Sequence, residues 1–107
     1  MGFFKKSFQK NVTRNNEFLK DYAIKCNGLA LYVEENEKVL KELNALKDDF
    51  QYTVATNIRD AKGLEKKIKK DFERLTNMLE QTDCDEGEVI MTIRAIRRSI
   101  TEISSMR

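Results

Sequence analysis

The sequence contains no proline and only four glycines among its 107 residues. These two residue types mark most turns and strand ends, so a chain that nearly lacks them has few places to reverse direction. Valine, isoleucine, threonine and the aromatic residues nowhere alternate with polar residues over the length of a strand. The sequence therefore predicts an all-α protein, and its length predicts a single domain over residues 1–107.

Apolar residues recur at helical spacing near the start of the chain, which predicts a first amphipathic helix over residues 3–26. Asn27 and Gly28 follow this stretch. Such a pair is typical of the position just beyond a helix end, where the backbone turns into the left-handed conformation. We therefore expect a turn at these two residues.

A three–four spacing of mainly apolar residues then continues from Leu29 to Met78. The spacing runs through Gly63 without a change of register, and a glycine inside a helix costs about 1 kcal/mol relative to alanine. We therefore predict a long central helix over residues 29–82, with a shorter antiparallel helix folded back on each half. The alternative is a break near Gly63, which would give a four-helix bundle.

The clearest later interruption is the stretch QTDCDEGE at residues 81–88. Asp85 and Glu88 have the spacing of a capping box, which predicts the start of a last helix over residues 86–106. Its apolar residues form one regular seam of four-three-four-three spacing, made of Val89, Ile93, Ile96, Ile100 and Ile103.

The two readings of the central region predict different molecules. A long central helix with one partner along each half leaves a wide apolar stripe exposed, and such a stripe indicates a homo-oligomer or a helical protein partner. Asn36 and Asn57 at heptad positions would then set the register of the contact. A four-helix bundle would instead bury the same residues inside one chain. The residues that we predict for the partner interface are Leu40, Leu43, Phe50, Val54, Ile93, Ile96, Ile100 and Ile103.

Several classes of catalytic site are excluded by composition. The chain has no histidine, so Ser-His-Asp and Cys-His arrangements cannot form. Two cysteines without histidine cannot complete a tetrahedral zinc site within one chain. No glycine-rich phosphate-binding loop is present. We therefore predict no enzymatic activity, no catalytic or metal-binding residues, no cofactor and no small-molecule substrate.

A basic stripe is predicted on one face of the helix that contains Gly63. In a projection of about 100° per residue its cations fall within one arc, opposite the apolar residues. Such a stripe suits phosphates or an acidic partner, although it has no aromatic residue to stack on a base, so nucleic acid is an unlikely ligand. The alternative is a solvated face that keeps the helix soluble. The stripe contains Arg59, Lys62, Lys66, Lys69, Lys70 and Arg74.

The first residues have the composition of a helix that lies on an anionic membrane surface. Phenylalanines share one half of the helical projection and lysines mostly share the other. The alternative is that the phenylalanines are ordinary core or dimer contacts. The candidate membrane residues are Phe3, Phe4, Phe8, Lys5, Lys6 and Lys10.

The sequence therefore favours a non-enzymatic interaction or assembly protein that acts through apolar helix faces. A peripheral membrane protein is the second hypothesis, and a protein that binds nucleic acid or an acidic partner through residues 59–74 is the third. The longest apolar run, residues 29–33, is far shorter than the roughly 20 residues that span a membrane. Because the first ten residues lack the apolar core of a secretory signal, the expected location is the cytoplasm.

Overall fold

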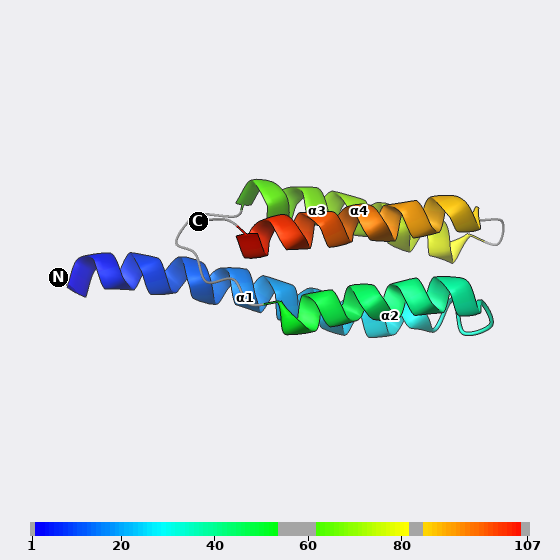
Figure 1. Cartoon of the computed structure of the whole chain (residues 1–107), viewed down its shortest axis with the longest axis horizontal. Coiled ribbons are helices and arrows are strands. Elements are labelled where there is room, and N and C mark those ends of the chain that lie inside the picture. The colour runs from blue at the N-terminus through cyan, green and yellow to red at the C-terminus, as the bar shows by residue number, and fades with distance from the viewer. Residues whose placement is uncertain (1, 54–61, 82–84, 106–107) are drawn as a thin grey trace.

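The computed structural model describes residues 2–53, 62–81 and 85–105. Within these residues lie four helices and no strand: α1 (Gly2–Ala30), α2 (Glu37–Tyr52), α3 (Lys62–Glu80) and α4 (Glu86–Ser105). α1 packs against α2 and α3 packs against α4, and the two hairpins meet mainly through α2 and α4 (Figure 1). The prediction of an all-α bundle is confirmed.

The bundle is elongated. Its extents are 55 × 19 × 19 Å and its radius of gyration is 15.1 Å, compared with about 13 Å for a compact domain of about 100 residues. Much of this length comes from α1, which has 29 residues whereas α2 has 16. At about 1.5 Å per residue these helices span about 43 Å and about 24 Å, so α1 cannot be covered along its whole length by α2.

The turn predicted at Asn27 and Gly28 is wrong. α1 continues through both residues to Ala30, and no glycine among the described residues has a positive φ. Cys26 and Leu29 are both buried. Continuing the helix through Gly28 keeps these two side chains on the same buried face, and that burial outweighs the cost of about 1 kcal/mol for a helical glycine.

The continuous helix predicted over residues 29–82 is also wrong, because the chain reverses at residues 31–36. The amides of Tyr32 and Val33 donate to the carbonyls three residues earlier, at 3.0 and 3.2 Å, so α1 tightens as it ends. Asn36, which was predicted to set a heptad register, is instead the N-cap of α2: its side chain accepts a hydrogen bond from the Val39 amide at 3.2 Å.

α2 and α3 are separate helices, as in the four-helix alternative. α2 ends at Tyr52, where the next residue, Thr53, has an extended backbone with φ −74° and ψ 130°. Gly63 is the second residue of α3 and is helical, so the glycine itself does not interrupt a helix. Residues 54–61, which include Val54, Asn57 and Arg59 of the predictions, lie outside the described residues.

The last helix agrees closely with its prediction, since α4 spans Glu86–Ser105. The Asp85 carboxylate accepts a hydrogen bond from the Gly87 amide at 2.8 Å, and the Asp85 carbonyl accepts one from Val89 at 3.0 Å. Asp85 therefore caps the helix as its position indicated. All five residues of the predicted apolar seam are buried.

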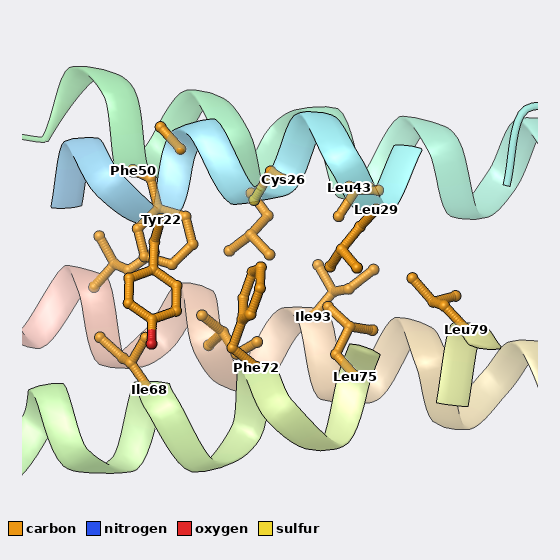
Figure 2. Packing of buried hydrophobic residues seen from close by; sticks show 14 of the residues in the cluster. Tyr22, Cys26, Leu29, Leu43, Phe50, Ile68, Phe72, Leu75, Leu79 and Ile93 are labelled. Atoms are coloured by element: carbon orange, nitrogen blue, oxygen red, sulfur yellow. The ribbon is translucent and has the colours of Figure 1, made fainter. Parts of the chain in front are cut away.

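One hydrophobic core runs along the axis of the bundle, with side chains from all four helices pointing into it (Figure 2). Toward the end where α2 stops, four rings pack together. Tyr22 lies edge-on to Phe72, with ring centroids 4.9 Å apart, and it also contacts Phe18 at 4.7 Å and Phe50 at 5.7 Å. Such aromatic pairs add specific geometry to the burial of large apolar areas.

Candidate functional site

The residues predicted to form a partner interface lie mostly inside the chain's own core. Their apolar surface is already covered within one chain, and a partner that used them would have to open the bundle. Their role in an interface therefore remains a prediction. Leu43, Phe50, Ile93, Ile96, Ile100 and Ile103 are buried, Leu40 is partly buried against them, and Val54 lies outside the described residues.

The start of α1 extends beyond the rest of the bundle (Figure 1). α1 and α3 run in the same direction, and Tyr22 of α1 packs on Phe72 of α3. By this register the start of α3 is level with about residue 12 of α1. About ten helical residues, or about 15 Å of helix, therefore protrude past α3. We call residues 2–14 the α1 extension. They include the predicted membrane residues and carry four basic residues and no acidic one.

The basic stripe lies on α3 at the same end of the bundle. Lys66, Lys69, Lys70 and Arg74 are exposed, so the structure brings four of the six predicted residues to one solvent-facing surface. Lys62 is the first residue of α3, and Arg59 lies outside the described residues. The Lys69 ammonium group is 5.9 Å from the centre of the Phe18 ring, which places the stripe beside α1.

The fold separates charge along its long axis. The end that carries the α1 extension, which we call the basic end, consists of residues 2–14, 47–52, 62–70 and 98–105, with eleven basic and four acidic residues. The opposite end, which we call the acidic end, consists of residues 28–41, 76–81 and 85–91, with seven acidic and two basic residues. Each half of the rod therefore presents one dominant sign of charge to a partner.

The acidic end contains the turn between α1 and α2, the end of α3 and the start of α4 (Figure 1). The Asn36 side-chain amide donates to the Glu86 carboxylate at 3.2 Å, so the turn after α1 is joined to the start of α4. A hollow at this end is lined by residues 31–38 and Glu86. Leu31 and Tyr32 stand at its edge with 71% and 55% of their surface exposed. Two large apolar side chains therefore sit among exposed carboxylates.

A second hollow lies on the outer side of the α1–α2 pair. Ile24 and Tyr52 are exposed there, and Lys20 and Lys47 line the same surface. This surface therefore has an apolar centre flanked by two cations.

The titratable groups of the core are structural in character. Burial raises the pKa of the Cys26 thiol to about 12, although Lys47 opposes this, so the group is a neutral thiol at physiological pH and a poor nucleophile. Burial, followed by the nearby charges of Asp21 and Glu73, also raises the pKa of Tyr22. Both groups are held in their uncharged forms by the apolar surroundings.

Two ion pairs join α2 to α4. The Arg94 guanidinium donates to Glu42 at 2.9 Å, and the hydrogen bond lowers the pKa of that carboxyl group. Arg97 Nε donates to Asp49 at 2.6 Å. Among the described residues no group of three or more side chains is arranged to hold a metal ion. The surface is therefore suited to binding through charge and exposed apolar residues.

The separation of charge between the basic end and the acidic end was not predicted from the sequence. Counted along the chain, only residues 1–28 show a marked excess, with six basic and two acidic residues. The two ends become apparent only when the helices fold back, because each end collects segments that are far apart in sequence. The acidic stretches at residues 34–37 and 83–88 were a signal, since acidic residues cluster at helix starts and both helix starts lie at one end.

No helix in the described part of the chain is both long enough and apolar enough to cross a membrane. Comparison with protein families, with curated proteins and with solved structures finds no match to this chain.

Proposed function

We propose that this protein is a non-enzymatic interaction protein, a self-contained helical bundle whose basic end binds an acidic surface of another protein. The observation that carries the proposal is the α1 extension, which protrudes from the bundle and has no acidic residue to neutralise its four cations. The exposed lysines of α3 follow it along the same end of the bundle, level with the next residues of α1, and extend the same field. Such a field steers an acidic partner and sets orientation more than it adds affinity.

The proposal differs from the sequence-based hypothesis in the surface that it uses. That hypothesis placed the contact on the apolar stripes, which the bundle buries in its core. A bundle with a covered core can act as a rigid support, and binding then falls to segments outside the core. The α1 extension meets this condition, and the core residues do not.

The test is binding of poly-L-glutamate, an acidic polypeptide without a fold of its own, measured by fluorescence anisotropy at several salt concentrations. We expect binding that weakens with salt, because exposed charges are screened within about 10 Å at 0.1 M salt. The variant Lys66→Gln/Lys70→Gln should bind more weakly. The matched variant Lys38→Gln/Lys41→Gln removes two exposed lysines near the acidic end and should bind as the unmodified protein does. Equal loss in both variants would contradict the proposal.

A second candidate function is binding to an anionic membrane surface. It is favoured by the coincidence of three phenylalanines and three lysines within the first ten residues, on a helix that protrudes from the bundle. To test this function, binding to vesicles with and without anionic lipid is compared between the unmodified protein and a variant that lacks residues 2–14. Loss of vesicle binding with unchanged helicity supports it, and collapse of the fold on deletion assigns the segment to the core instead.

Nucleic-acid binding is tested with a duplex oligonucleotide, again by fluorescence anisotropy at several salt concentrations. It is ruled out if the affinity does not fall as the salt concentration rises.

A further inference from the structure

The two ends of the bundle differ in shape as well as in charge. At the basic end the start of α1 extends beyond the end of α2, the start of α3 and the end of α4 (Figure 1). At the acidic end the turn between α1 and α2 lies level with the end of α3 and the start of α4, and the hollow lined by residues 31–38 and Glu86 opens there (Figure 1). A protruding end and a blunt, hollowed end can fit together.

The chemistry of the two ends is also complementary. In the α1 extension Phe4, Phe8 and Val12 continue the helical spacing of the buried residues of α1, so the apolar stripe of this helix runs on past the bundle. At the acidic end Leu31 and Tyr32 supply exposed apolar surface. The cations of the extension face a carboxylate-rich rim that includes Glu34, Glu35 and Glu37, all of them exposed.

From this fit, which rests on the proposed function, we infer that the acidic partner is a second copy of this chain, and that the α1 extension of one copy docks on the acidic end of the next. Charge selects this arrangement. Two basic ends would repel each other, as would two acidic ends, whereas a basic and an acidic end attract. The contact is heterologous, and when copies join end to end along the axis of the rod, each added copy leaves one basic and one acidic end free.

The expected contact is small. The part of the extension that protrudes past α3, about ten helical residues, is about 15 Å long, and interfaces below about 1,200 Å² are typical of weak, reversible association. The assembly should therefore grow with protein concentration and shrink with salt. Sedimentation velocity over a range of protein concentrations at low salt, repeated at high salt, measures both dependences.

The decisive experiment uses two charge-neutralised variants. In Lys5→Gln/Lys6→Gln/Lys10→Gln the basic end is weakened, and in Glu34→Gln/Glu35→Gln/Glu37→Gln the acidic end is weakened. Each variant alone should associate about tenfold less tightly than the unmodified protein, which corresponds to about 1.4 kcal/mol. Mixed in equal amounts, they keep one intact end each, so the mixture should form pairs that do not grow further. Circular dichroism confirms that both variants keep their helices.

The apolar part of the contact is tested separately with Leu31→Ser. Its matched control is Met91→Ser: Met91 also belongs to the acidic end and is equally exposed, at 70%, but it does not line the hollow at residues 31–38. Leu31→Ser should weaken association and Met91→Ser should not. Equal effects would assign the association to general surface hydrophobicity and would overturn the proposed contact.

Other outcomes separate this inference from the proposed function. A protein that stays monomeric at low salt but still binds poly-L-glutamate overturns the inference and leaves the proposed function standing. Failure of both assays overturns both. If the acidic-end variant associates normally while the basic-end variant does not, the basic end contacts a surface other than the acidic end, and the head-to-tail arrangement is wrong. A monomer that binds only anionic vesicles identifies the membrane as the partner.

Discussion

The two ends of this bundle are built from the same kind of helix but are finished differently. At the acidic end side chains satisfy the helix starts: Asn36 caps α2 and donates a hydrogen bond to Glu86, and Asp85 caps α4. At the basic end one helix runs past its neighbours. The comparison shows that a helical bundle can complete one end by local hydrogen bonding and extend a single helix at the other, while the same class of residue forms the core throughout.

The largest effect on the difference between the two ends is expected from a substitution that weakens the core beside the basic end. Phe50 is fully buried and contacts the rings of Tyr22 and Phe72. Phe50→Ala should lower the free energy of unfolding by about 3–5 kcal/mol, because it leaves a large cavity. Urea unfolding followed by circular dichroism measures the change. If both ends belong to one cooperative unit, the midpoint falls while the m-value stays constant. A second transition would show that the basic end unfolds by itself.

The stability of the protein at high pH tests whether the core around Cys26 excludes solvent. The pKa of Cys26 is about 12 in the folded protein and its ordinary value is 9.0. Because the folded-state value is the higher one, its contribution to stability is complete below pH 9 and is lost as the pH rises toward 12. Relative to Cys26→Ala, the protein should lose about 1.4 kcal/mol per pH unit in this window. Unfolding measured at several pH values checks this, and parallel curves for the two proteins would mean that the thiol is open to solvent.

Removal of a cap should affect the acidic end alone. Asn36→Ala deletes the hydrogen bond to the Val39 amide and the one to Glu86, and it should cost about 1 kcal/mol. Asn44→Ala is the matched control, because Asn44 is exposed within α2 and alanine suits a helix. Chemical denaturation compares the two variants. An equal cost would show that Asn36 contributes nothing beyond its side-chain volume.

The smallest effect is expected at the ion pair between Arg97 and Asp49. Both side chains are partly exposed, so screening limits the pair to about 0.2–1 kcal/mol. A double-mutant cycle with Arg97→Ala and Asp49→Ala isolates the coupling energy. The coupling should decrease at high salt, and a coupling that is independent of salt would mean that packing, rather than charge, connects α2 and α4 at this position.

The parts of the fold that were predictable from sequence have strong local signals. α4 begins at a capping aspartate and keeps a regular apolar seam, so its bounds and its buried face could both be derived. The turn at residues 31–36 has neither proline nor glycine, and the apolar spacing passes through it unchanged. The available signal was Asn36 preceded by Glu34 and Glu35, since asparagine is a good N-cap and acidic residues favour a helix start.

The candidate surface was predictable only in part, and for a physical reason. The basic residues of the α1 extension and of α3 each show in the sequence as a local cluster. Whether the two clusters reinforce each other depends on the direction in which α3 runs relative to α1, which follows from where the chain turns. If one turn is predicted in the wrong place, the charge pattern between distant segments cannot be derived, even when every local cluster has been recognised.

The order of the helices has a practical consequence for labelling. α1 begins and α4 ends at the basic end of the rod (Figure 1). A fluorophore or fused domain attached ahead of Gly2 or after Ser105 therefore sits beside the basic end, and one ahead of Gly2 lengthens the segment that protrudes. At the acidic end a label can be attached at an exposed internal position such as Glu34. A reporter placed there leaves the α1 extension unobstructed.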